Sequence, residues 1–247
     1  LLAVMGPSPA AYVRAFDLRK DRSTLSAFVH RWITGADVSA LLWILRRMLD
    51  RSGSIEGFFM SGRDAEHPGM AHDLERFSAR ALEIDVTAAY GGRPLRPSGP
   101  SRASGLPSGP GVRYFFPRPS TGSACKRLNL FLRWMVRRDA LDLGIWTAVS
   151  PSELIVPLDT HIVRVGRCLG LTRYVSPGWA MASDITAALR RLDPDDPVRY
   201  DFSMCHMGMM NACGFNAPQR DAHCPLRGLC RPAGRRRPRS RRPSARP

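Results

Sequence analysis

Two stretches decide the fold of this chain: GSACK at residues 122–126 and VPLDTHIVR at residues 156–164. In the second stretch, Asp159 precedes an amphipathic segment, at the position where a carboxylate caps a helix by accepting backbone N–H groups. In the first, Gly122 permits a tight turn and is followed closely by Lys126. The sequence therefore places a lysine near the start of one helix and an aspartate at the start of another. We interpret the rest of the chain as the scaffold that brings them together.

Apolar residues recur at helical spacing along most of the chain, and sustained strand alternation is missing, which predicts an all-α protein. The helix after the lysine turn is predicted over 123–138, with Ser123 as its cap. One face of it is apolar, and a second, polar face carries Lys126, Asn129, Arg133 and Arg137. Further helices are predicted over 24–34, after an Asp37 cap, and over 71–89, 160–168, 179–192 and 200–213.

The composition divides the chain into four parts. Residues 1–90 and 114–231 carry the helical patterns, whereas residues 91–113 are crowded with Gly, Pro and Ser and predict a flexible insertion. Residues 232–247 are rich in Arg and Pro, lack the apolar residues a core needs and predict a disordered basic tail. The chain begins at Leu1 without Met, which predicts that an N-terminal piece is missing.

Charge is the strongest bulk property. The 247 residues contain 37 Lys and Arg against 21 Asp and Glu, a net charge of +16, and eight of the arginines lie in the last 17 residues. Removing these eight charges leaves +8, which favours a polyanionic partner such as nucleic acid. The alternative is a solvated basic surface in an arginine-rich protein. No apolar run approaches the roughly 18 residues that span a bilayer, so we expect no membrane partner and a cytoplasmic location.

Five segments carry a resemblance to a known family: residues 122–137, 142–146, 156–164, 196–202 and 224–230. They resemble the DUF2400 family, a bacterial branch that is itself similar to the helix-hairpin-helix DNA glycosylases of base-excision repair. The hairpin of that superfamily reads roughly Leu-Pro-Gly-Val-Gly-x-Lys. Gly122 and Lys126 match its first glycine and its lysine, while Ala124 replaces its second glycine. The lysine-to-aspartate interval is similar to that of the archaeal oxoguanine glycosylase branch.

The resemblance implies a two-lobed helical fold and a repair enzyme that removes a damaged base from double-stranded DNA. Lys126 would attack C1′ of the sugar and form a Schiff base, after burial or a neighbouring cation had deprotonated it. Asp159 would stabilise positive charge on the sugar ring. The implied DNA-binding residues are Gly122, Ser123 and Ala124 through the turn, and Arg133, Arg137 and Arg164 through phosphate contacts. A monomer associated with the bacterial nucleoid is expected.

The six cysteines, in an expected reducing compartment, favour metal ligands or buried thiols over disulfides. Related glycosylases carry an iron–sulfur loop, Cys-x6-Cys-x2-Cys-x5-Cys. Cys224 and Cys230 keep its last spacing, and Cys213 would be the first ligand, one residue farther from Cys224 than the pattern gives. Asp221 stands where the second cysteine of the pattern would be. Cys205, His206 or His223 would complete a site for an iron–sulfur cluster or zinc. The alternative is a loop without metal that keeps buried thiols.

Two other functions remain open on the sequence. One is a DNA-binding protein on the same scaffold that recognises a lesion without cutting. The other is a general nucleic-acid-binding protein whose basic tail supplies most of the affinity.

Overall fold

The computed structural model of the 247-residue chain describes residues 1–93, 111–210, 224–227 and 229. These residues form a mostly helical molecule whose sole sheet in the described ranges is a two-stranded hairpin, which confirms the expected all-α class. None of the helices in this described part combines the length and apolarity that crossing a bilayer requires. The predicted insertion and the basic tail fall almost wholly outside the described residues.

Ten α-helices occur in the described ranges. They are α1 (Leu2–Met5), α2 (Pro9–Ala15), α3 (Leu18–Asp21), α4 (Gly35–Ser52), α5 (Ile55–Met60), α6 (Met70–Leu82), α7 (Lys126–Val136), α8 (Thr160–Cys168), α9 (Trp179–Arg190) and α10 (Asp201–Met209). Short 3₁₀ helices connect them: η1 (Arg22–Leu25), η2 (Thr87–Tyr90), η3 (Gly111–Tyr114), η4 (Pro119–Thr121) and η5 (Pro151–Glu153).

The prediction of a helix over 24–34 is wrong. The segment instead forms an antiparallel hairpin of β1 (Val29–His30) and β2 (Ile33–Thr34), in which Val29 pairs with Thr34. Arg31 adopts a left-handed conformation (φ 57°) at the turn, which a helix does not tolerate. The apolar residues that suggested a helical stripe lie instead in η1, in the hairpin and in the link between them.

Helix α4 begins earlier than its sequence predicted. Thr34, not Asp37, is its N-cap, and Asp37 is the third helical residue of a capping box. The Asp37 carboxylate accepts hydrogen bonds from the Thr34 N–H and hydroxyl, both at 2.8 Å. Gly35 is required here because a Cβ would lie 1.7 Å from the Leu25 carbonyl oxygen.

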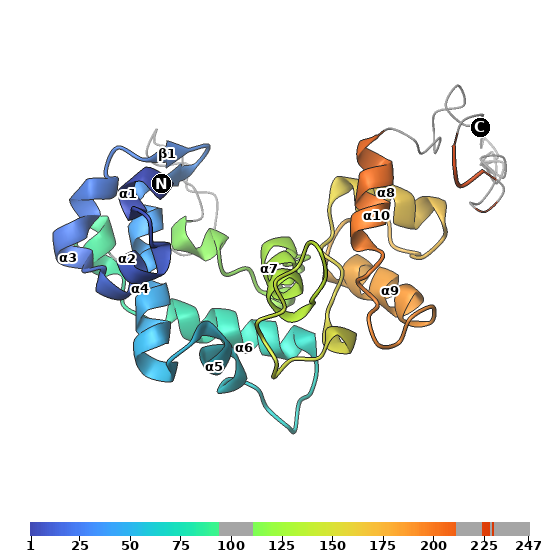
Figure 1. The fold of residues 1–247 in the computed structure, drawn as a ribbon, viewed down its shortest axis with the longest axis horizontal. Coiled ribbons are helices and arrows are strands. Elements are labelled where there is room, and N and C mark those ends of the chain that lie inside the picture. The colour runs from blue at the N-terminus through green and yellow to red at the C-terminus, as the bar shows by residue number, and fades with distance from the viewer. Residues whose placement is uncertain (94–110, 211–223, 228, 230–247) are drawn as a thin grey trace, which may run out of the picture.

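The ribbon forms an arc along which the α-helices follow one another in chain order, while η2 and η3 return to pack against α4 (Figure 1). Helices α1–α4 and the hairpin lie at one end, α5 and α6 run along the lower edge, α7 lies in the middle, and α8–α10 form the other end. One connected set of buried apolar side chains runs through it. It includes Met48, Phe58 and Leu74 in the first half and Ile162 and Ile185 in the second.

The junction between α6 and α7 fixes the lysine turn. Glu75 of α6 accepts hydrogen bonds from the backbone N–H and the hydroxyl of Ser120, at 3.1 and 2.9 Å, and pairs with Arg118 at 2.8 Å. Ser120 lies in η4, and this short helix ends directly before Gly122. A surface helix from the first half of the chain therefore holds the turn that leads into the second half.

Candidate active site

Lys126 and Asp159 lie next to each other although 33 residues separate them in the sequence. Lys126 is the first residue of α7, and Asp159 is the residue before α8. The distance from the Lys126 Nζ to the Asp159 Oδ2 is 3.9 Å. The lysine side chain is 50% exposed and the aspartate 16%, so the pair sits at the surface with its carboxylate side half-enclosed.

The two oxygens of Asp159 have different partners. Oδ1 accepts the backbone N–H groups of His161 and Ile162, at 2.9 and 2.7 Å, which makes Asp159 the N-cap that the sequence predicted. Oδ2 faces Lys126 and the Cys205 thiol. Capping therefore holds the carboxylate in one orientation, with its second oxygen turned toward Lys126 and Cys205.

Cys205 belongs to this site. Its Sγ, on α10, donates to Asp159 Oδ2 at 3.2 Å. Burial first, and then the hydrogen bond to Asp159, raise the pKa of the Cys205 thiol to about 11. The thiol is thus protonated at neutral pH and acts as a donor rather than a nucleophile. From the sequence, Cys205 was a candidate metal ligand, and its hydrogen bond to Asp159 was not predicted.

Asp201 lies one turn before Cys205 on α10 and is buried. Arg133 of α7 donates to it at 2.5 Å and to Asp142 at 3.1 Å. Burial is the main cause that raises the pKa of Asp201 to about 6; the nearby carboxylates of Asp159 and Asp142 act in the same direction, and Arg133 opposes them. Sequence spacing alone contained a signal for this residue, since positions 201 and 205 share one face of a helix.

The structure buries Arg133 and Arg137, the two arginines of α7 for which phosphate contacts are predicted. Their side chains are only 6% and 8% exposed. Arg133 pairs with Asp142 and Asp201; Arg137 pairs with Asp139, Asp142 and Asp196. The polar face of α7 is covered by α10 and by the segment after α7, so these arginines neutralise buried carboxylates instead of facing solvent.

Asn129 shares this covered face. It is buried, and its Nδ2 donates to the Ala124 carbonyl at 3.0 Å. Of the four polar residues predicted to lie on an exposed face of α7, Lys126 is therefore the one that the structure leaves at the surface.

The turn before α7 differs in detail from its prediction. Gly122 is left-handed (φ 78°) and closes η4, but the cap position of α7 is Cys125, also left-handed (φ 47°), rather than Ser123. Ser123 instead accepts the Cys125 N–H through its hydroxyl at 3.2 Å. The Gly122 N–H bonds the Pro119 carbonyl at 2.9 Å and is not available to a phosphate. Ala124, like Ser123, is half-buried.

The turn also touches α9. The N–H of Trp179, the first residue of α9, donates to the Gly122 carbonyl at 3.2 Å. A Cβ at Gly178 would lie 2.8 Å from that same carbonyl oxygen, so a glycine is needed for the approach. The start of α9 thus holds the lysine turn at Gly122, in addition to Glu75's contact with Ser120.

Arg164 supports the packing of α8 rather than facing solvent. The side chain is half-buried and donates to the Gly208 carbonyl on α10. It lies one turn along α8 from Thr160, so its guanidinium ties α8 to α10 close to Asp159 and Cys205.

The cysteine site is only partly within the described residues. Cys213 and Cys230 fall outside them, Cys224 is buried and Cys205 contacts Asp159. Across the described ranges, one group of three His, Cys or acidic side chains has the proximity that metal ligands need, and it contains no cysteine: Asp64, His67 and His72.

Two cavities lie away from the Lys126–Asp159 pair. One, of about 200 Å³, is lined mainly by the β1–β2 hairpin, α4 and η3. The other, of about 310 Å³, is lined by the start of α6, Glu153 and α9. Neither cavity is lined by Lys126 or Asp159.

Comparison with known proteins yields one match. The model of a family described as "Protein of unknown function (DUF2400)" matches residues 1–210, which include α1 to α10. Neither a curated protein nor a solved structure matches the chain.

Proposed function

The chain belongs to the DUF2400 family, and from the chemistry of its candidate site we propose that it is a DNA N-glycosylase with lyase activity, acting on a damaged base in double-stranded DNA. The proposal includes a helix-hairpin-helix glycosylase-like scaffold, in which η4, the Gly122 turn and α7 form the hairpin unit. The alternative is a DNA-binding protein on the same scaffold that does not cut.

The observation that carries the proposal is the approach of the Lys126 ammonium to the Asp159 carboxylate at 3.9 Å, with half of the lysine exposed. An amine and a carboxylate side by side at an accessible surface are the two groups that base removal with strand nicking requires. The carboxylate stabilises the positive charge that develops on the sugar. The amine, once neutral, is the nucleophile.

The choice of lysine supports a chemical role. The chain has two lysines, Lys20 and Lys126, among its 37 Lys and Arg residues. An arginine at position 126 would form an ion pair with Asp159 at least as well, because its guanidinium is a better partner for a carboxylate. Only a lysine has an amine that can bond to carbon, so the site uses the rarer residue where the chemistry demands it.

The proposed reaction proceeds in balanced steps. The lysine nitrogen, after losing a proton, bonds to C1′ as the glycosidic bond breaks and the base leaves with the bonding electron pair. The nitrogen releases a further proton, the C1′–O4′ bond breaks as O4′ takes up a proton, and the opened sugar is held as an iminium between Lys126 and C1′. Loss of a proton from C2′ then expels the 3′ phosphate and nicks the strand. The target nucleotide is first turned out of the duplex, which costs a few kcal/mol and least for a damaged base.

One observation favours the non-catalytic alternative. The resemblance implies that burial or a neighbouring cation releases the lysine amine, but Lys126 is half-exposed and its partner is an anion. An exposed ion pair of this kind fits DNA binding without chemistry. Catalysis also requires the bound DNA to free the amine from its carboxylate partner.

A borohydride-trapping assay tests the proposal. The protein is incubated with duplexes that contain an abasic site, 8-oxoguanine or uracil, and borohydride reduces any iminium to a stable protein–DNA adduct. We expect an adduct on at least one lesion, and its loss in Lys126→Ala.

Lys20→Ala is the matched control, because it removes the other lysine of the chain from an exposed position on α3. Adduct formation that survives Lys126→Ala but not Lys20→Ala would contradict the assignment. Tight lesion-specific binding without an adduct on the whole panel would favour the non-catalytic alternative.

A further inference from the structure

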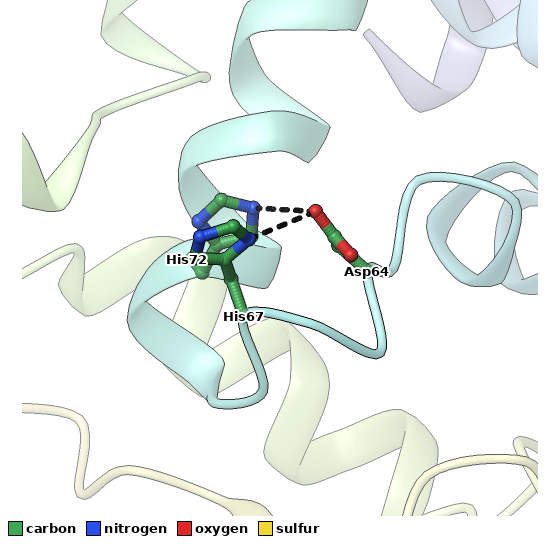
Figure 2. Close-up of side chains that lie close together, drawn as sticks. All are labelled: Asp64, His67 and His72. Carbon is green, nitrogen blue, oxygen red and sulfur yellow. Dashed lines mark hydrogen bonds and ion pairs between the residues drawn. The ribbon is translucent and has the colours of Figure 1, made fainter.

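A second group of chemically capable side chains lies in the segment between α5 and α6 and at the start of α6. Asp64 and His67 lie in the connecting loop, and His72 lies in the first turn of α6. Figure 2 shows the two imidazole rings stacked, each with one nitrogen turned toward the Asp64 carboxylate. The ring centroids are 5.2 Å apart and the rings are inclined by 22°.

The three ligand atoms are close to the arrangement of a metal site. His67 Nδ1 lies 3.1 Å from Asp64 Oδ2, and His72 Nε2 lies 3.9 Å from the same oxygen. All three atoms fall within 4.8 Å of one another. Ligand atoms around a tetrahedral zinc ion, with bonds of about 2.0–2.1 Å, are roughly 3.3 Å apart. The Asp64–His67 edge already has this length, and the His67 side chain, 63% exposed, is free to approach His72. The Asp64–His72 edge, at 3.9 Å, would have to shorten by about 0.6 Å.

The Asp64 carboxylate is oriented for ligation. Its Oδ1 accepts the Glu66 N–H at 2.9 Å, which leaves Oδ2 facing the histidines. This N–H contact, followed by the His67 hydrogen bond, holds the pKa of Asp64 below its ordinary value. Such a backbone contact to the second oxygen is the kind of support that fixes metal-ligating carboxylates.

The His72 Nε2 supplies an independent observation. The atom is buried and has no hydrogen-bond partner in the structure, and 3.9 Å to Asp64 is too long for one. A buried polar nitrogen without a partner costs about 1–3 kcal/mol, so such an atom calls for a ligand. A cation held between His72 and Asp64 satisfies it.

We propose that Asp64, His67 and His72 bind a divalent transition-metal ion of the zinc type, through Oδ2, Nδ1 and Nε2, with a fourth position open to water. Two imidazoles and one carboxylate are a ligand set that zinc accepts. The ion would fasten the loop that precedes α6 to the first turn of that helix. This site is separate from Lys126 and Asp159 and does not depend on the proposed repair activity.

A purely electrostatic cluster is the competing explanation. Arg76 NH1 lies 3.8 Å from Asp64 Oδ2, and protonated histidines also pair with a carboxylate. The Arg76 side chain is 45% exposed, so it can move away when a cation arrives. At 3.9 Å the ion pair leaves the buried His72 Nε2 without a hydrogen bond, whereas a metal ion would coordinate this nitrogen directly.

The test uses the full chain, stripped with a chelator and titrated with Zn²⁺. We expect one ion per chain whose affinity falls at least tenfold in His67→Ala and in Asp64→Asn, the latter of which keeps the Glu66 contact but removes the charge. His30→Ala, an exposed histidine of the β1–β2 hairpin, is the matched control and retains the affinity.

Cobalt substitution separates this site from the cysteines. Co²⁺ bound by nitrogen and oxygen shows ligand-field bands without the intense thiolate charge-transfer band. Zinc affinity that is unchanged in His67→Ala, zinc binding that is missing from the wild type, or cobalt whose spectrum shows only thiolate ligation would each overturn the proposal. Because His67 is mostly exposed, its substitution leaves the fold intact, which circular dichroism checks.

Discussion

Asp159 uses its two carboxylate oxygens for two tasks, and a single substitution separates them. Asparagine caps helices about as well as aspartate, so in Asp159→Asn the Oδ1 contacts to His161 and Ile162 persist. The charge that faces Lys126 is lost. We expect the free energy of unfolding to change by less than about 1 kcal/mol. The rate of adduct formation should fall by about 10²-fold or more, as for loss of one electrostatic stabiliser.

Single-turnover trapping and thermal melts measure the two effects on the same variant. Asp159→Ala is the comparison, since it removes both the charge and the cap and adds a stability loss of about 1 kcal/mol. An Asp159→Asn protein that traps DNA at the wild-type rate would show that the carboxylate is only a helix cap.

The titration of Asp201 changes the stability of the fold with pH in the direction opposite to that of a carboxylate whose pKa is lowered by folding. Its folded-state pKa, about 6, is above the ordinary value of 3.8, so between these values the folded protein holds a proton that the unfolded chain releases. Its contribution to stability is therefore full below about pH 4 and is lost as the pH rises through 6. The shift corresponds to about 3 kcal/mol.

Asp201→Asn removes this titration. We expect the stability of the variant relative to wild type to improve as the pH rises from 4 to 7, whatever the offset that the lost Arg133 contact introduces. Denaturant unfolding at several pH values measures the slope, with the exposed Asp195→Asn as control. Parallel profiles for wild type and Asp201→Asn would rule out the proposed burial effect.

At the scale of elements, the packing of α10 on α8 positions the Asp159 surroundings. Gly208 of α10 lies directly over His161 of α8, where an added Cβ would be 2.5 Å from the His161 Cβ and 2.9 Å from its Nδ1. Arg164 of α8 donates to the Gly208 carbonyl at the same crossing. The backbone of α10 therefore packs directly against a side chain of α8. This contact positions α10, and with it Cys205 and Asp201.

Gly208→Ala should force α10 away from α8. We expect destabilisation of about 1–3 kcal/mol, because overpacking outweighs the better helix propensity of alanine. Adduct formation should fall too, as Cys205 moves from Asp159. Thermal melts and trapping measure these effects, and Ser203→Ala, on the exposed side of the same helix, should change stability by less than about 0.5 kcal/mol. A Gly208→Ala protein as stable as Ser203→Ala would mean that the helices are not in close contact.

The packing of elements also explains why the sequence predicted an exposed position for two arginines that are buried. In sequence, Arg133 and Arg137 share a helical face with Lys126, and basic residues on a helix face are usually solvated. In the structure they lie under α10 and the segment after α7, paired with carboxylates up to 68 residues away. Helical periodicity fixes which residues share a face, but not which element covers it.

At the scale of the whole molecule, the net charge of +16 is divided between the helical body and the C-terminal arginines. Deleting residues 232–247 removes seven arginines. Each phosphate contact contributes about 0.9 to the slope of log affinity against log salt, so we expect the slope to fall by up to about 6. Affinity for undamaged duplex should fall with it.

Trapping by the truncated chain should persist at low salt, because Lys126 and Asp159 remain. Filter binding or fluorescence anisotropy over a salt series measures the slope. Loss of both affinity and trapping in the truncated chain would favour a protein whose basic tail, rather than its helical body, engages DNA.

The sequence by itself determined the features that depend on neighbouring residues: the all-α class, the Asp159 cap and the extent of α8, which was predicted over the residues where it occurs. Helix capping and turn formation depend on residues only a few positions apart, so the local sequence is enough to predict them. Only the tertiary structure decided that Lys126 meets Asp159, that Cys205 joins them, and that Arg133 is buried. These depend on how α7, α8 and α10 pack, and packing is set by the combined burial of side chains far apart in the chain.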